Sequence, residues 1–169
     1  MASTDQYIVF ELGSEDFGIK ITEVQEIIKP QEVTTLPQSA DFIEGIINLR
    51  GEIIIIIDLR KRLGFTTDEK GDSRILIVNI NGQGIGFVVD DASEVISISD
   101  DVISETATGI TGIRDEFLSG VGKLENRLII LLNLNRLLTS KEKGYIEEVL
   151  DNKDVISEAI DEDDSTENE

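Results

Sequence analysis

The sequence is defined first by what it lacks. Its 169 residues contain no Cys, His or Trp, only two Pro and one Met, and aromatic residues make up 5% of the chain. The absence of Cys excludes disulfides, thiol nucleophiles, zinc thiolate sites and iron–sulfur clusters. The absence of His removes the commonest general base and the commonest metal ligand. These absences favour a binding or scaffolding protein that carries no cofactor over an enzyme.

Basic residues are also scarce, because 15 Lys and Arg stand against 35 Asp and Glu, a net charge of −20. From Glu147 to Glu169 there are 11 acidic residues and one Lys, a net of −10. We therefore expect residues 151–169 to form a disordered acidic tail, whose deletion leaves partner binding nearly unchanged. A field of this sign repels nucleic acid and anionic membrane surfaces, so neither is an expected partner.

Long apolar runs are missing as well. The longest contain five residues, Ile53–Ile57 and Leu128–Leu132, which is too short to cross a bilayer. A signal peptide has a basic region followed by an apolar stretch, and the first residues of this chain contain neither. The sequence therefore predicts a cytoplasmic protein without membrane insertion.

What is present is a series of short segments rich in Ile and Val, separated by turn dipeptides such as Arg50-Gly51 and Asn81-Gly82. This pattern favours an all-β sandwich or barrel. Strands are expected at the ranges 7–12, 17–21, 24–28, 42–49, 52–57, 74–80, 85–89, 94–98, 117–121, 123–124 and 127–132. The all-Ile run should be buried on both faces.

Helices are expected in three places. Asp58 and Asn133 are favoured N-caps for short helices at Leu59–Leu63 and Leu134–Leu138, and Gly64 would end the first of them. A C-terminal helix should contain Tyr145, Ile146, Val149 and Leu150, which recur at helical spacing.

The chain contains an internal repeat. At an offset of 75, the range 42–63 aligns without gaps on the range 117–138, with seven of 22 positions identical, Gly45 and Gly120 among them. In the same alignment Gly51 falls on Asn126, and both residue types tolerate the positive φ of a turn. At an offset of 68, the range 10–27 aligns on the range 78–95, with Glu26 on Glu94. Two copies of one small β unit are therefore expected.

The segments Tyr7–Phe10, Val24–Ile28, Asn48–Gly51, Ile57–Arg60 and Gly86–Asp90 resemble, in order and spacing, the CheW-type chemotaxis coupling domain. The resemblance covers residues 6 to about 150. It implies a fold of two interlocked five-stranded SH3-like barrels, one at roughly 7–65 and the other at roughly 73–140, with some strand exchange. Many family members have Pro where Ile55 stands, Pro where Ala40 stands and Gly where Asp91 stands.

The resemblance also implies a function. It implies a non-catalytic cytoplasmic adaptor, recruited to membrane receptor arrays, that couples methyl-accepting chemoreceptors to the histidine kinase CheA through the regulatory domain of the kinase. The cytoplasmic tip of the receptor would bind near the groove between the barrels. The implied receptor-binding residues are Val24, Glu26, Ile27, Gly45, Arg50 and Gly51. The implied kinase-binding residues are Ile28, Val33 and Ile43.

Simpler structural roles compete with these assignments. Arg50 can be an ordinary turn residue, although Glu125 occupies its position in the second copy, so the turn itself does not require Arg. Gly45 can serve backbone geometry alone, and Ile28, Val33 and Ile43 can be core residues. A different β-barrel interaction module of another cytoplasmic signalling system also remains open.

Two motifs have competing chemical interpretations. Asp90-Asp91 and Asp100-Asp101 could suggest a metal site or an acid/base pair, but neighbours on a strand point to opposite faces and no calcium-loop spacing surrounds them. The Gly-rich range 82–86 is expected to join two strands and to open no helix, which excludes a phosphate-binding loop.

Overall fold

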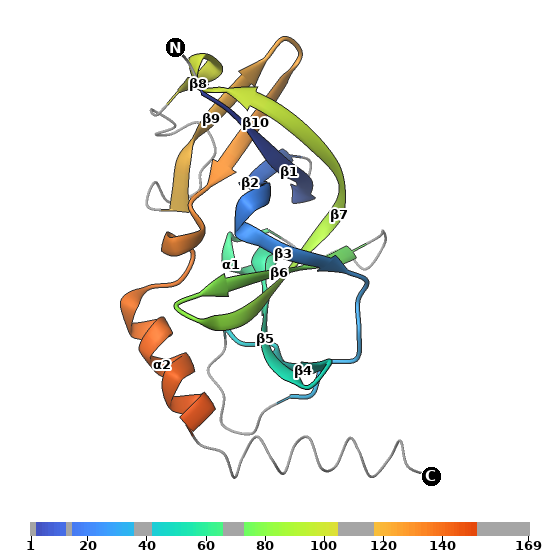
Figure 1. Cartoon of the computed structure of the whole chain (residues 1–169), viewed down its shortest axis with the longest axis vertical. Coiled ribbons are helices and arrows are strands. Elements are labelled where there is room, and N and C mark those ends of the chain that lie inside the picture. The colour runs from blue at the N-terminus through green and yellow to red at the C-terminus, as the bar shows by residue number, and fades with distance from the viewer. Residues whose placement is uncertain (1–2, 13–14, 36–41, 66–72, 105–116, 152–169) are drawn as a thin grey trace.

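The computed structural model describes residues 3–12, 15–35, 42–65, 73–104 and 117–151. The expectation of a mostly β protein with few helices is confirmed (Figure 1). The strands are β1 Thr4–Leu12, β2 Glu15–Lys20, β3 Val24–Ile28, β4 Gly45–Leu49, β5 Glu52–Asp58, β6 Ser73–Ile80, β7 Gln83–Ser99, β8 Ile103–Ser104, β9 Leu118–Leu124 and β10 Arg127–Leu132. The helices are α1 Leu59–Arg62 and α2 Ser140–Asp151, with 3-10 turns η1 Ile21–Glu23, η2 Asp100–Val102 and η4 Leu134–Arg136.

The two halves of the chain exchange strands. β1 pairs with β2 and with the C-terminal part of β7, and β10 adds to β2 in parallel. β6 pairs with β3 and with the N-terminal part of β7, and β5 adds to β7 in parallel. We call β1, β2, β8, β9, β10 and the end of β7 barrel 1, and β3, β4, β5, β6 and the start of β7 barrel 2. Figure 1 shows β7 arching from one barrel to the other.

This exchange extends further than the sequence boundaries suggest. The hairpin β4–β5 from the first half lies in barrel 2, and the hairpin β9–β10 from the second half lies in barrel 1. A division into barrels at about residues 65 to 73 therefore does not match the strand pairing. The repeat itself does match, because the offset of 68 superimposes β1–β3 on β6–β7 and the offset of 75 superimposes β4–β5 on β9–β10.

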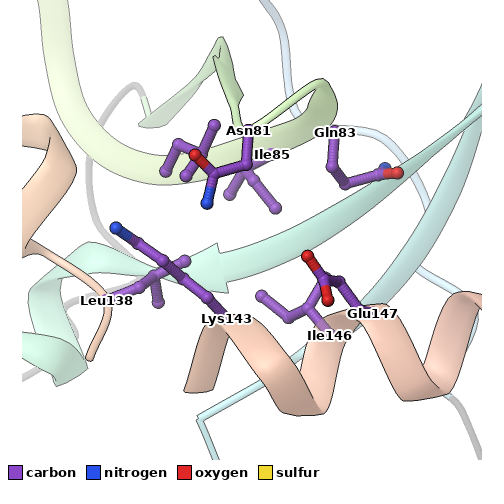
Figure 2. A pocket seen from close by; sticks show the side chains of 8 residues that line it. Asn81, Gln83, Ile85, Leu138, Lys143, Ile146 and Glu147 are labelled. Atoms are coloured by element: carbon purple, nitrogen blue, oxygen red, sulfur yellow. The ribbon is translucent and has the colours of Figure 1, made fainter. Parts of the chain in front are cut away.

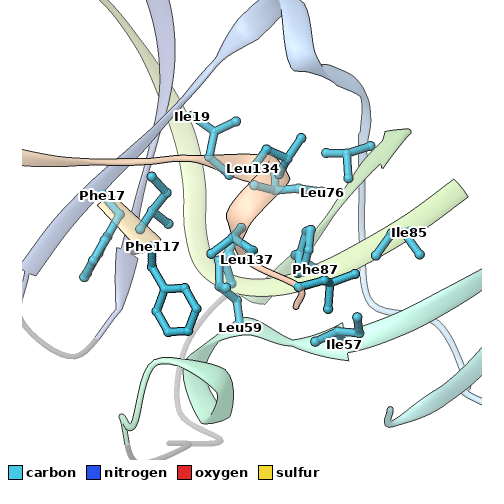
Figure 3. Packing of buried hydrophobic residues seen from close by; sticks show 14 of the residues in the cluster. Phe17, Ile19, Ile57, Leu59, Leu76, Ile85, Phe87, Phe117, Leu134 and Leu137 are labelled. Carbon is cyan, nitrogen blue, oxygen red and sulfur yellow. The ribbon is translucent and has the colours of Figure 1, made fainter. Parts of the chain in front are cut away.

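Three apolar clusters hold this arrangement together. The largest draws side chains from both barrels, with Phe17 of barrel 1 and Phe87 of barrel 2 both fully buried in it (Figure 3). A second cluster lies within barrel 1 around Tyr7 and Ile129, and a third lies within barrel 2 around Ile75 and Ile54. The internal repeat aligns the second cluster with the third. Tyr7 corresponds to Ile75 at the offset of 68, and Ile54 corresponds to Ile129 at the offset of 75. Each small barrel thus has its own interior and shares a larger core.

The Ile run on β5 follows from these clusters. Ile55 and Ile57 face the shared core, whereas Ile54 and Ile56 face the interior of barrel 2. All four are at most 1% exposed, which confirms that the strand is covered on both faces. Ile55 pairs with Ile46 on one side and with Ile85 on the other. Many relatives have Pro at this position, but here Ile55 belongs to a regular strand ladder.

Two strand predictions were wrong in detail. β7 is one strand of 17 residues, where the sequence predicts separate strands at 85–89 and 94–98. Asp91 lies between these ranges at φ +40°, and the β1–β7 register shifts between Val9 and Glu11, so an irregularity bends the strand instead of ending it. Likewise β9 continues through Gly122, because the backbone there stays paired with Ile129.

The helix caps follow the predicted chemistry. Asp58 accepts a hydrogen bond from the Arg60 backbone N–H at 3.0 Å, and Gly64 after α1 has φ +87°. Asn133 likewise accepts from the backbone N–H of Asn135 at 3.1 Å, although this second helix is a single 3-10 turn that ends before Leu138.

The C-terminal helix is present as α2, and a reciprocal cap begins it. The Thr139 hydroxyl accepts from the backbone N–H of Glu142, and the Glu142 carboxylate accepts from the backbone N–H of Thr139. The same carboxylate forms an ion pair with Arg62 of α1. Ile146 is 3% exposed in the shared core, so the helix is anchored by charge and by packing. The side chains of Val149 and Leu150 lie outside the described set, as do Ala40 and residues 152–169.

Candidate functional site

Two of the predicted receptor-binding residues meet at one end of barrel 2. Arg50 from the β4–β5 turn donates to Glu26 of β3 through both terminal nitrogens, with Nη1 at 3.2 Å from Oε1. The Arg50 side chain stays 68% exposed in this pair, and that of Glu26 is 34% exposed. A guanidinium has five N–H donors, so the pair leaves donors of Arg50 directed to solvent.

Arg50 has a backbone conformation in the β4–β5 turn that is unusual for Arg. Arg50 has φ +52° and Gly51 has φ +88°, the combination typical of a two-residue hairpin turn. At the corresponding place in the β6–β7 hairpin, Asn81 at φ +53° precedes Gly82 at φ +84°. Asn is a favoured residue at such a φ and Arg is not, so Arg50 is held in a conformation that costs about 1 kcal/mol.

The matching turn of barrel 1 differs. Neither Glu125 nor Asn126 has a positive φ, so Asn126 does not share the turn geometry of Gly51 although its residue type would tolerate it. The two turns are nevertheless alike in position, because each joins the strands of the hairpin that completes a barrel.

Barrel 1 carries a related ion cluster whose arginine comes from a different position. Arg127, at the start of β10, donates to the Glu94 carboxylate at 2.9 and 3.0 Å and to Asp16 at 2.9 and 3.2 Å. Glu94 is the repeat counterpart of Glu26, so both barrels hold an Arg–Glu pair at this position. The cation, however, comes from the turn in barrel 2 and from the strand after the turn in barrel 1.

These pairs shift the acidities of their members in the expected directions. The hydrogen bond from Arg50 lowers the pKa of Glu26, and that from Arg127 lowers the pKa of Glu94. Hydrogen bonds to the carboxylates raise the pKa of each Arg. Both pairs are therefore fully ionised at neutral pH.

Gly45 lies inside the fold. A Cβ on this residue would stand 2.3 Å from the backbone O of Thr34 and 2.6 Å from Val33 Cγ1, and its φ is +154°. Its repeat counterpart Gly120 has φ +159° and meets Ile103 and Ser104 in the same way. Both glycines let a neighbouring segment approach the backbone of a strand closely, a role that the paired sequence positions already suggested.

The other two predicted receptor-binding residues are less closely grouped. Val24 is half-buried and packs against the shared core. Ile27 is 37% exposed, but it neighbours Glu26 on a strand and so points to the opposite face. The structure therefore unites Glu26, Arg50 and Gly51, and separates Ile27, Val24 and Gly45 from them.

The predicted kinase-binding residues do not form one exposed surface. Ile43 is 5% exposed in the shared core, which favours its alternative role as a core residue. Ile28 and Val33 are partly buried and pack against the interior of barrel 2. The exposed large apolar side chains of the described residues are Ile27, Val95 and Leu128. Sequence reasoning missed the last two, although Val95 is the repeat counterpart of Ile27.

The carboxylate pairs have structural explanations. Asp90 accepts from Arg60 Nη1 at 3.0 Å, and the same guanidinium holds Asp58, which is 6% exposed, at 2.8 Å. Asp101 lies in the η2 turn, whose first residue is Asp100, and its N–H faces the Ser99 hydroxyl at 3.4 Å. Within the described ranges, no three Asp or Glu side chains group closely enough to hold a metal ion. Asn81 and Gly82 form the turn between β6 and β7, and residues 83–86 begin β7, so the Gly-rich range opens a strand and not a helix, as predicted.

A small cavity separates α2 from the β6–β7 hairpin. Figure 2 shows Ile85, Leu138 and Ile146 at this gap, with Lys143 and Glu147 at its rim. Its volume of ≈ 30 Å³ has room for about one water molecule and none for a cofactor.

Among the described residues, none of the helices has the length and the apolar composition of a membrane span.

The fold and its charged barrel ends define a class of protein, a double SH3-like barrel that presents ion pairs at exposed hairpin turns. The chain belongs to the CheW family, because a model of the CheW-like domain matches residues 6–142. It is a chemotaxis scaffold protein of that family.

Individual relatives agree. The chain is 35% identical over 147 residues to the chemotaxis protein CheW of Klebsiella aerogenes, covering 85% of this chain and 87% of the relative. It is 38% identical over 142 residues to that of Treponema pallidum, covering 81% and 84%. The crystal structure of the scaffolding protein TtCheW from Thermoanaerobacter tengcongensis superimposes with a TM-score of 0.75 at 39% identity, covering 83% of this chain and 91% of that one.

Proposed function

We propose that the chain is a non-catalytic adaptor that joins chemoreceptors to the histidine kinase CheA on the cytoplasmic side of a receptor array. The observation that carries the proposal is Arg50, a charged residue kept at a positive φ where its repeat counterpart is Glu125. Backbone strain at an exposed residue that the turn does not require is typical of a functional position.

The receptor half of the proposal rests on the chemistry of Arg50. The guanidinium is preset by Glu26 and keeps free donors in solvent, so it can bind a receptor carboxylate in the planar two-bond geometry that Arg favours. Glu26 then acts by positioning Arg50. Gly51 permits the tight turn that carries it, because its φ of +88° suits Gly.

The kinase half rests on family membership and on the double-barrel fold. We assign the contact with the CheA regulatory domain to the edge of barrel 2 near Ile28 and Val33, whose side chains are partly exposed. Ile43 is withdrawn from this contact because it is buried. An interface of this kind needs apolar side chains at its centre and charged ones at its rim.

A co-sedimentation experiment tests the bridging role. Vesicles that display a chemoreceptor cytoplasmic domain are mixed with the CheA regulatory domain, with and without this chain, and pelleted. We expect the kinase domain to pellet only when the chain is present. The Arg50→Glu variant should abolish this bridging, whereas Lys123→Glu, the same charge change at an exposed site on barrel 1, should retain it. A kinase domain that pellets equally in both mixtures would contradict the proposal.

A further inference from the structure

Barrel 2 has an open polar pocket at the start of β5. Its volume is ≈ 270 Å³, and it lies between Glu52, Gln25 of β3 and the β6–β7 hairpin, with Asn79, Gln83 and Gly84 in its wall. Figure 1 shows these strands together in the lower part of the molecule. The lining of this pocket is mostly polar and includes a carboxylate.

The internal repeat shows what occupies the equivalent place in barrel 1. Glu52 corresponds to Arg127 at the offset of 75, and Gly84 corresponds to Asp16 at the offset of 68. In barrel 1 the Arg127 guanidinium extends between Asp16 and Glu94 and forms hydrogen bonds with both. That barrel end is therefore filled by an arginine of the chain itself.

In barrel 2 the same two substitutions remove the Arg127–Asp16 ion pair and reverse the charge at the start of the strand. Gly84 has no side chain to replace that of Asp16, and a Cβ there would stand 2.6 Å from Ile54 Cδ1, so Ile54 takes up that part of the site. Glu52 presents an acid where Arg127 presents a base. Among the described residues, no basic group lies within ion-pair distance of the Glu52 carboxylate. Arg50 and Glu52 attract each other only at longer range, without a hydrogen bond between them. Arg50 is itself neutralised by Glu26, so the pocket keeps an uncompensated negative charge.

The other polar groups of the pocket offer acceptors. Gln83 donates its Nε2 to the backbone oxygens of Ile53 and Gly84, both at 3.0 Å, which leaves its amide oxygen available. The Asn79 amide oxygen accepts from the Gly82 N–H at 2.8 Å and retains a second lone pair. A carboxylate and two amide oxygens suit the five donors of a guanidinium.

We propose that this pocket binds an arginine side chain presented by a partner protein, beside Glu52, the residue that corresponds to Arg127 of barrel 1. The inserted guanidinium pairs with Glu52 as Arg127 pairs with its own carboxylates. The inference does not depend on whether that partner is a receptor or a kinase, because it rests on the pocket and on the repeat.

Nuclear magnetic resonance tests this with a small probe and the full chain. The probe is Nα-acetyl-arginine methylamide, and the citrulline analogue is the neutral control of similar shape. With the arginine probe we expect saturable chemical-shift changes at the backbone amides of Gln25 and the hairpin residues 82–84, with a dissociation constant in the millimolar range. The citrulline analogue should bind at least threefold more weakly.

Matched variants complete the test. Glu52→Gln should weaken arginine-probe binding at least threefold, whereas Glu125→Gln, at an exposed turn of barrel 1, should leave it unchanged. The proposal is overturned if no shifts appear up to 50 mM probe, if the citrulline analogue binds within threefold, or if Glu52→Gln binds within threefold of the parent chain. Far-ultraviolet circular dichroism of each variant confirms that the fold is retained.

Discussion

Replacing Gly45 with Ala is expected to lower the free energy of unfolding by about 3 kcal/mol or more, among the largest effects of a single substitution. The new Cβ would stand 2.3 Å from the backbone O of Thr34, and a backbone atom cannot move away by changing a rotamer. Thr34 also pairs with Ile46 through two backbone hydrogen bonds of 2.8 and 2.9 Å, so the clash would displace that bridge. Urea denaturation followed by circular dichroism measures the change.

Gly51→Ala is the matched control. Gly51 also has a positive φ, but a Cβ there meets nothing within 4 Å, so only backbone strain of about 1 kcal/mol is expected. If Gly45→Ala kept its stability and lost receptor binding alone, Gly45 would be a direct contact residue and the structural role argued for it would be wrong.

Arg50→Asn is expected to reduce receptor affinity at least tenfold, about 1.4 kcal/mol, while the chain stays as stable as before or becomes slightly more stable. Asn removes the guanidinium that binds the receptor carboxylate. It also suits φ +52° better than Arg does, a gain of about 1 kcal/mol that offsets the loss of an exposed ion pair with Glu26.

Two measurements separate these effects. Thermal unfolding reports the stability of the variant, and titration with receptor-bearing vesicles reports its affinity. Lys123→Asn on barrel 1 controls for the lost positive charge, and it should bind receptor like the parent chain. Receptor affinity of Arg50→Asn within twofold of the parent chain would remove Arg50 from the proposed contact.

Local features of this fold could be predicted from the sequence because they depend on neighbouring residues. The all-Ile strand, the Asp58 cap and the α2 helix follow from burial pattern, cap chemistry and helical spacing. The repeat was visible because both copies must meet the same steric demand at Gly45 and Gly120.

Features that depend on distant residues could not be predicted. Nothing near β5 indicates that it adds to β7 instead of a strand of its own half, because that choice is made by the shared core of both barrels. For the same reason Ile43 could not be distinguished from a surface residue. The bend at Asp91 was also hidden, since an irregular strand and two separate strands leave similar sequence patterns.

The candidate site shows the same limit. Glu26 and Arg50 were each singled out, but their pairing joins residues 24 positions apart and became visible only in the fold. Arg127 was not singled out, because a strand-end arginine has no local signal. The repeat alignment could have found it, since Arg50-Gly51-Glu52 and Glu125-Asn126-Arg127 carry opposite charges at matched positions.

Calorimetric titration of this chain against the CheA regulatory domain at moderate salt tests the adaptor account most directly. We predict saturable binding with a dissociation constant of about 10 µM or lower, near −7 kcal/mol, at one chain per kinase domain. A chain that is folded by circular dichroism and shows no saturable binding would leave the double barrel intact and contradict its role as the link to the kinase.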